Sequence, residues 1–485
     1  MENYRIKNST IIVIVSFLLA FLALITVPYA LLDATDVKDY ADTAKFFAGE
    51  YKASLRTTHS VVYGLMLSPY AKANSYLLIR FSSVFWLILI ILSLYWISGK
   101  DRRVLLLFVI SPFIWHMAPW ISPVPAVSLL LLWTYYFLSK FEKNGENVNL
   151  VYAGLLNGVA ATLWDTSLYF SLIFLISFLY NKKLYLSFIF LTSVFVGIIP
   201  KLIVDQIVFG FPFYGFIKFT AALLAFAFFG GNYGQGYSSP SLIRYIIVLV
   251  FVPLYYYKFY RKEYFVRYKK EIIFLTLSIL FILTNPQIRL LLTIAPIILL
   301  IVGKNLTEKE FRISLIVSAI LTLITITPYL IQSQYETNNR YADSFIADFS
   351  NTEINKTVSW KIIIEDLKSI EKDYPNEIFV VGNANDDYRV LGHLYWGDGI
   401  NEFVSIEDYR LFLSNETTIV SKKFSTNVGK DIRRDIWIKA GIDKSKNDDT
   451  NYKDIKYGIS FEDNLDIPEF SEEKKYGKLT VFKKE

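Results

Sequence analysis

Long apolar runs are the feature that most restricts what this chain of 485 residues can fold into. A helix needs about 20 mostly apolar residues to cross a bilayer, and somewhat fewer where it is broken or its ends reach the interface. Such runs recur throughout residues 1–331, with short polar segments between them. The sequence therefore predicts a polytopic α-helical membrane protein. The predicted spans, about eleven by this length criterion, are residues 10–32, 76–98, 104–118, 122–139, 150–164, 167–181, 185–207, 242–258, 272–284, 290–303 and 313–331.

Charge divides the chain at residue 331. Residues 332–485 carry 29 Asp/Glu and 22 Lys/Arg, whereas the much longer segment 1–331 carries only 15 and 28. The net charges are thus −7 and +13, and a shift of this size excludes a single soluble globule or a disordered chain. It also excludes a nucleic-acid binder inferred from the overall charge of +6. We predict a membrane domain at 1–331 and a soluble α/β domain at 332–485.

The distribution of Lys and Arg predicts the orientation in the plasma membrane. With the N-terminus in the cytoplasm, the cytoplasmic segments hold 18 Lys/Arg and the longer outer loops at most 10. This is the asymmetry of the positive-inside rule, and an odd number of spans then places the C-terminal domain outside the cell. No small-residue cleavage site follows the first run, so we expect it to be a retained span. The chain has no cysteine, which excludes disulfides and thiolate metal sites.

Four carboxylates lie within ten residues of the first outer loop, at Asp33, Asp36, Asp39 and Asp42. In a helix, positions 36, 39 and 40 would share one face, which would bring Tyr40 beside two of the acids. An alternative is a charged helix start, because Asp is favoured there by capping and by the helix dipole.

Further polar residues fall on the same predicted side of the membrane. Arg56 and His59 continue the first outer loop, and Arg289 stands at an outer helix end, where an arginine can also simply snorkel to the interface. Asp165 occupies an outer turn, either as a polar site residue or as a helix cap. Lys201 and Asp205 are four residues apart and can pair, and an interfacial aromatic belt is the favoured explanation for His116.

The order of these short motifs resembles the multi-span glycosyltransferases of the GT-C class. The resemblance covers roughly residues 10–331 and rests on the residues Asp36, Tyr40, Ala44, Gly49, Arg56, His59, Tyr63, Ser111-Pro112, Phe209-Gly210-x-Pro212, Arg289 and Pro296. The GT-C class includes dolichyl-phosphate-mannose-type mannosyltransferases, some of which glycosylate proteins, and the lipid A aminoarabinose transferases.

The resemblance implies transfer of a sugar from a polyprenyl-phosphate donor to an extracytoplasmic acceptor, either a lipid-linked glycan or a protein, with inversion. Asp36 would be the general base, with Asp33 as the competing candidate. Asp39 would stand for a second acidic residue, but it lies three positions on rather than one, so a divalent cation is left open. Arg289 would neutralise the phosphate, with Arg56 and His59 as secondary contacts.

Two further residues belong to the implied substrate site. Tyr40 follows Asp36 at the offset usual in these enzymes, and Asp165 matches a position that is often polar in them.

The C-terminal segment shows a mixed α/β pattern. It predicts helices at 360–370 and 386–396 and strands at 377–382, 417–420 and the final 478–482. Tyr395-Trp396-Gly397-Asp398-Gly399 is similar to the Trp-Trp-Asp motif of oligosaccharyltransferases, but an additional Gly separates Trp396 from Asp398. A plain Gly-Asp-Gly turn explains that segment better.

Other functions remain open from the sequence. A transporter or flippase for lipid-linked saccharides would place charges along a midplane path and often shows inverted repeats. The chain shows no internal repeat, and its membrane-depth charges lie near the outer rim. A small oligosaccharyltransferase-like enzyme and a sensor that acts through its C-terminal domain are further alternatives. The glycosyltransferase is the favoured hypothesis.

Overall fold

The computed structural model describes a helical bundle followed by a small sheet. The residues that it describes are 7–26, 34–49, 60–73, 76–179, 182–217, 220, 266–283, 288–332, 360–382, 402–406, 409, 413, 453–461, 465, 467–477 and 479–485.

Helices account for the whole described part of residues 1–331 outside the turns. They are α1 (Asn8–Thr26), α2 (Ala34–Ala48), α3 (Val61–Lys72), α4 (Tyr76–Ile97), α5 (Arg102–Val109), α6 (Pro112–Met117), α7 (Val124–Asn144), α8 (Asn147–Leu163), the 3₁₀ turn η1 (Asp165–Ser167), α9 (Leu168–Phe174), the π-helical turn η2 (Leu175–Leu179), α10 (Leu184–Phe209), α14 (Lys269–Leu283), α15 (Ile288–Leu291), α16 (Ala295–Gly303) and α17 (Glu308–Gln332).

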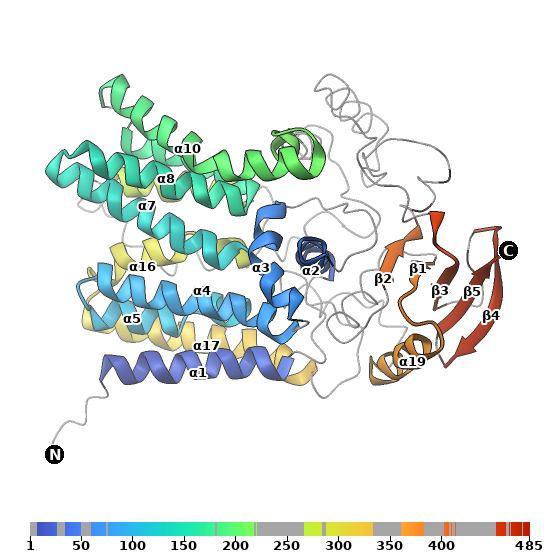
Figure 1. Cartoon of the computed structure of the whole chain (residues 1–485). Coiled ribbons are helices and arrows are strands. Elements are labelled where there is room, and N and C mark those ends of the chain that lie inside the picture. The colour runs from blue at the N-terminus through green and yellow to red at the C-terminus, as the bar shows by residue number, and fades with distance from the viewer. Residues whose placement is uncertain are drawn as a thin grey trace, which may run out of the picture.

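Four of the described helices, α1, α4, α7 and α10, contain stretches that are long and apolar enough to cross a membrane. Figure 1 shows the long helices side by side in one bundle. Large apolar side chains such as Phe17, Phe188 and Ile207 lie on its outside and are 69%, 70% and 77% exposed. A helix that is apolar on both its buried and its exposed sides is suited to lipid rather than to water.

Described helices lie at ten of the eleven predicted positions, although α15 and α16 divide the run 290–303, and the eleventh position, 242–258, lies outside the described residues. The prediction of one continuous helix at 104–118 is wrong, because the chain forms α5 and α6 with a break at Ile110–Ser111. Pro112 is the first residue of α6. Proline has no N–H group to donate and its ring clashes with the preceding turn, so a helix can begin at Pro112 but cannot run through it.

The helices α8 and α10 approach each other through glycines. A Cβ atom on Gly158 would lie 2.2 Å from the carbonyl oxygen of Val194 and 2.8 Å from the Cα of Gly197. A Cβ atom on Gly154 would likewise lie 2.5 Å from the carbonyl oxygen of Phe190. The two backbones are therefore in direct contact, as in the small-residue interfaces common between membrane helices.

The bundle has two ends that differ in their surroundings. We call the end at which α1 finishes and α4 begins the α2 end, because α2 and α3 lie there, and Figure 1 shows the C-terminal sheet beyond it. The opposite end holds the start of α1 and the finish of α4, where the Asn8 amide donates a hydrogen bond to the Tyr95 hydroxyl.

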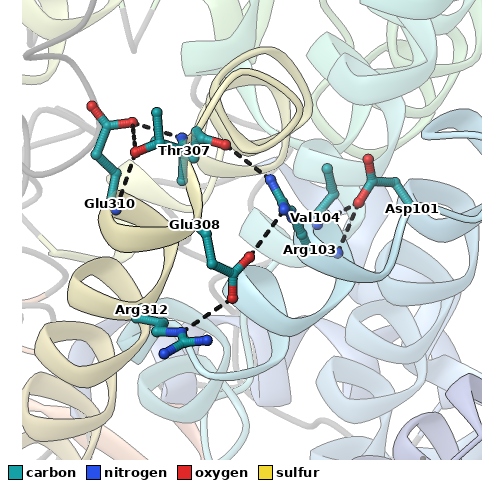
Figure 2. A network of polar contacts seen from close by, with 8 residues as sticks. Asp101, Arg103, Val104, Thr307, Glu308, Glu310 and Arg312 are labelled. Atoms are coloured by element: carbon teal, nitrogen blue, oxygen red, sulfur yellow. Dashed lines mark hydrogen bonds and ion pairs between the residues drawn. The ribbon is translucent and has the colours of Figure 1, made fainter.

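Ion pairs and caps hold the turns at the opposite end (Figure 2). Arg103 of α5 donates to the carbonyl oxygen of Leu306 at 2.9 Å and to Glu308 of α17 at 3.0 Å. Thr307 and Glu310 form a reciprocal cap, because the Glu310 carboxylate accepts from the Thr307 N–H while the Glu310 N–H donates to the Thr307 hydroxyl. This cap starts α17 at Glu308, five residues before the predicted apolar run.

The described part of the C-terminal segment contains one helix, α19 (Trp360–Asp373), and a five-stranded sheet of order β2-β1-β3-β5-β4. The strands β2 and β3 pair parallel to β1, whereas β5 pairs antiparallel to both β3 and β4. The strands are β1 (Ile378–Val381), β2 (Glu402–Ser405), β3 (Tyr457–Ser460), β4 (Phe470–Tyr476) and β5 (Leu479–Lys484).

One face of this sheet packs against α19. Leu367 and Ile370 of the helix bury themselves against Phe379 and Val381 of β1 and against Val481 of β5. The helix predicted at 360–370, the strand at 377–382 and the final strand are therefore confirmed. The predicted elements at 386–396 and 417–420 and the segment 395–399 lie outside the described residues.

Candidate functional site

The helix α2 carries the acidic segment of the first predicted outer loop. Its bounds, Ala34–Ala48, include Asp36, Asp39 and Tyr40, so these three positions do lie in a helix and share a face by their spacing. Tyr40 is buried and its ring packs edge-on against Tyr63 of α3, with 5.1 Å between the ring centroids. The candidate residues Asp33, Arg56 and His59 lie outside the described residues.

A glycine allows α2 to dock tightly on α3. A Cβ atom on Gly64 would lie 2.3 Å from Cγ2 of Thr43, which is itself buried. Tyr40, Ala41 and Ala44 of α2 share one apolar cluster with Tyr63 of α3. The backbone that carries Asp36 is thus fixed against α3 about one helical turn before Tyr40.

Two neighbouring serines of α4 connect this helix pair to the next group of residues. The Ser82 hydroxyl lies 3.3 Å from the hydroxyl of the fully buried Tyr63. The Ser83 hydroxyl donates a hydrogen bond to the main-chain carbonyl oxygen of Trp120. Packing and hydrogen bonds therefore lead from α2 through α3 and α4 to Trp120.

Arg289 lies against Trp120. Its guanidinium carbon is 5.3 Å from the centroid of the Trp120 ring, a cation–π distance. Arg289 belongs to the short helix α15, where the next two residues, Leu290 and Leu291, are buried. His116 of α6 is also buried, with its ring centroid 5.4 Å from that of Trp120. Arg289 therefore has a defined protein contact, and His116 belongs to this interior group rather than to an exposed aromatic belt.

A second charged group lies on the opposite side of α3, between α8, α9 and α10. The Lys201 ammonium is 3.0 Å from Asp165 and 3.2 Å from Asp205, and none of the Lys201 side chain is exposed. The predicted pairing of Lys201 with Asp205 is confirmed. Asp165 starts η1 but pairs with Lys201, so the alternative of a helix cap is wrong.

The segment after α10 closes over this group. The Gly215 N–H donates to Asp205 at 3.0 Å, and the Phe216 ring centroid lies 5.2 Å from the Lys201 ammonium. A Cβ atom on Gly215 would lie 2.4 Å from that ammonium, so a larger residue there would have to displace it. The contact of Asp165 with Lys201 could not be predicted from the sequence, because the two residues are far apart in the chain and on different helices.

Hydrogen bonds connect the two groups across the α2 end. The Ser60 hydroxyl, just before α3, donates to the carbonyl oxygen of Thr162 at 2.6 Å, and the Thr162 hydroxyl donates to the carbonyl oxygen of Gly197 at 2.9 Å. The α2 end thus gathers the backbone of the acidic segment, Arg289 and the buried Lys201. Within the described residues no group of three or more His, Asp or Glu residues is arranged to hold a metal ion.

Comparison with solved structures finds a similar fold over nearly the whole chain. The chain is similar to the crystal structure of ArnT from Cupriavidus metallidurans bound to undecaprenyl phosphate, with a TM-score of 0.60 and 10% identity. The apo structure of ArnT from the same organism gives a TM-score of 0.53 and 9% identity. Each alignment covers 98% of this chain and 97% of the other.

Comparison by sequence adds no relative, because no family model and no curated protein matches the chain. The structural likeness supports the expected polytopic helical fold, which is similar to that of ArnT. The count of eleven spans, the orientation of the termini, the domain boundary at residue 331 and the roles of the site residues stay predictions.

Proposed function

We propose that this protein is an integral membrane glycosyltransferase that moves a sugar from a polyprenyl-phosphate donor to an extracytoplasmic acceptor. The observation that carries the proposal is the likeness, over nearly the whole of both chains, to ArnT bound to undecaprenyl phosphate. The contacts that lead from the acidic helix α2 through α3 and α4 to Trp120 and Arg289 support it. The α2 end would face the outside of the cell.

The acidic helix would supply the general base. A carboxylate of α2, for which Asp36 is the first candidate, takes the proton from the acceptor hydroxyl as that oxygen attacks the anomeric carbon of the donor. The bond between that carbon and the phosphate oxygen breaks, and its electron pair leaves with the polyprenyl phosphate. Attack opposite the phosphate inverts the anomeric configuration. General-base assistance of this kind is worth about 10²–10⁴-fold in rate.

Arg289 would bind the phosphate that leaves. A guanidinium stays charged at any working pH and presents several N–H donors in one plane, which suits the oxygens of a phosphate. Because the phosphate gains negative charge as the glycosidic bond breaks, a fixed cation stabilises the transition state more than the ground state.

The test is sugar transfer from a labelled polyprenyl-phosphate sugar in membranes that contain the full-length protein. Asp36→Asn is expected to lower kcat by about 10²–10⁴-fold. Arg289→Ala is expected to lower kcat/KM for the donor by about 10–150-fold, the equivalent of a hydrogen bond to a charged group. Full activity in both variants would refute the assignment.

Matched variants on the same loop identify the base. Asp33→Asn and Asp39→Asn test the two competing carboxylates, and Asp42→Asn is the control for a change of charge on the same helix. If Asp33→Asn abolishes transfer while Asp36→Asn does not, the role of base passes to Asp33. An Asp42→Asn variant as inactive as Asp36→Asn would mean that the charge of the segment matters rather than one carboxylate.

A further inference from the structure

Trp120 is a residue of the α2 end whose ring lies against Arg289. It lies in the turn between α6 and α7 and is 1% exposed, which makes it one of the largest fully buried side chains of the described residues. Its position is fixed from several sides. The Ser83 hydroxyl donates a hydrogen bond to the main-chain carbonyl oxygen of Trp120, and the main-chain N–H of Trp120 donates to the carbonyl oxygen of Met117 at 3.1 Å. The ring of His116 lies beside the Trp120 ring.

Arg289, by contrast, is only partly buried, and its helix α15 is just four residues long. So short a helix makes few hydrogen bonds of its own, and a long arginine side chain gives up considerable rotamer freedom when it is held in one place. The guanidinium carbon of Arg289 lies 5.3 Å from the centroid of the Trp120 ring, so a long side chain with many rotamers contacts a buried ring that is held in place.

A guanidinium held over an aromatic ring keeps its N–H donors around its edge, where an oxygen acceptor can reach them. Holding the group in advance also lowers the entropy lost when an anion binds. We propose that Trp120 is a positioning residue that holds Arg289 for the phosphate of the polyprenyl carrier, so that it sets donor affinity without touching the sugar or the acceptor. This inference rests on the proposed function.

Two neighbouring serines of α4 connect Trp120 to the helix pair of α2 and α3. Ser83 holds Trp120 while its neighbour Ser82 contacts Tyr63, which packs on Tyr40 of α2. The same turn of α4 therefore holds both the platform for Arg289 and the helix pair that carries the acidic segment. That turn of α4 therefore contacts both the residues that carry the proposed base and those beside the proposed phosphate contact.

The experiment measures binding of undecaprenyl phosphate to the purified full-length protein in detergent, together with donor and acceptor KM and kcat for transfer. Trp120→Leu is expected to weaken undecaprenyl phosphate binding and raise the donor KM by about 2- to 30-fold, the range of a cation–π contact. Acceptor KM is expected to stay unchanged. Trp120→Phe keeps an aromatic face and is expected to recover part of the loss.

Two controls separate positioning from folding. Phe311→Leu removes the same type of contact at the opposite end, where Arg103 lies 5.6 Å from the Phe311 ring, and it should leave binding unchanged. Trp115→Phe alters a tryptophan of the same helix α6 whose N–H bonds to the carbonyl oxygen of Val109. In an Arg289→Ala background, Trp120→Phe should cause no further loss of binding, since there is no longer a guanidinium to position.

The outcomes distinguish this inference from the proposed function. One outcome is that the wild-type protein binds undecaprenyl phosphate, that this binding depends on Arg289, and that Trp120→Phe and Trp120→Leu both bind it as well as the wild type does. The role of Trp120 is then refuted and the proposed function stands. If Trp120→Phe weakens binding equally with and without Arg289, Trp120 is structural and the inference is also refuted. If the wild-type protein neither binds the carrier nor transfers sugar, both proposals fail.

Discussion

Two ion pairs with the same nitrogen–oxygen distance of 3.0 Å lie at the two ends of the bundle. At the opposite end, the side chains of Arg103 and Glu308 are 41% and 56% exposed. At the α2 end, the side chains of Lys201 and Asp165 are 0% and 5% exposed, and Asp205 at 1% shares the same ammonium. The two ends therefore use the same chemistry in very different surroundings.

The difference shows which charges the fold depends on. An exposed pair is screened by water and contributes about 0–1 kcal/mol. A buried pair gains little over an apolar substitute, but breaking one partner leaves an uncompensated charge and costs about 3–5 kcal/mol. The charges at the opposite end can therefore be exchanged at low cost, whereas those at the α2 end fix the arrangement of α8, α9 and α10.

The largest expected effect comes from Lys201→Met, which leaves Asp165 and Asp205 buried without their ammonium. We expect the free energy of unfolding to fall by about 3–5 kcal/mol, measured by denaturant unfolding of the protein in detergent. The triple variant Lys201→Met/Asp165→Asn/Asp205→Asn removes all three charges and should recover part of that loss. If Lys201→Met is as stable as the wild type, the comparison between the two ends is wrong.

A smaller loss of stability is expected from Gly158→Ala, because Gly158 lies where the backbones of α8 and α10 touch. The new Cβ atom would lie 2.2 Å from the carbonyl oxygen of Val194, so the helices must separate. Overpacking of this kind costs about 1–3 kcal/mol, visible in the same unfolding measurement. The control is Val159→Leu on the next, outward-facing position, which is 37% exposed and should change stability by less than about 0.5 kcal/mol.

Arg103→Met tests the other side of the comparison. Because the Arg103–Glu308 pair is exposed, we expect stability to fall by about 1 kcal/mol or less. Raising the salt concentration should reduce the difference from the wild type, since salt screens exposed charges. A loss as large as that of Lys201→Met would show that burial is not what separates the two ends.

The smallest expected effect is a pH dependence at an exposed pair of the C-terminal segment. Hydrogen bonds from Lys474 and then Tyr476 lower the pKa of Asp373 below its usual range. A carboxyl group with a lowered pKa in the folded state stabilises the fold above its unfolded pKa of about 3.9 and loses this contribution as the pH falls through the folded value.

The variant Asp373→Asn isolates this contribution. At neutral pH it should have a slightly lower midpoint of thermal unfolding than the wild type. The difference should disappear as the pH falls from about 4 through the lowered folded pKa. A difference that persists or grows in acid would contradict the assignment to Asp373.

The apolar runs predicted most of the bundle, because length and hydropathy are local properties of the chain. They placed the ends of helices less well. The helix α7 runs on to Asn144 through Lys140, Glu142 and Lys143, and ends where Gly145 takes a φ of 71°. The apolar run predicted an end for this helix at residue 139, because the polar residues of its last turn do not belong to an apolar run. The break before Pro112 was also predictable, because a helix cannot continue through a proline.

The candidate site was predictable where residues are close in the sequence. The pairing of Lys201 with Asp205 follows from a spacing of one helical turn. Neither Asp165 beside Lys201 nor Trp120 beneath Arg289 could be predicted, because each contact joins separate helices and depends on how they pack. Tertiary contacts of this kind leave no periodic pattern in one sequence.

Among the described strands the C-terminal sheet ends at β4, whose residues from Ser471 to Lys475 are all exposed. An edge strand offers unpaired N–H and C=O groups to any other extended chain, and charged side chains on it discourage such pairing. Here two glutamates and two lysines follow one another along the strand. Another strand that docked there would have to accommodate two acidic and then two basic side chains, so the charge on this edge disfavours pairing with a second chain.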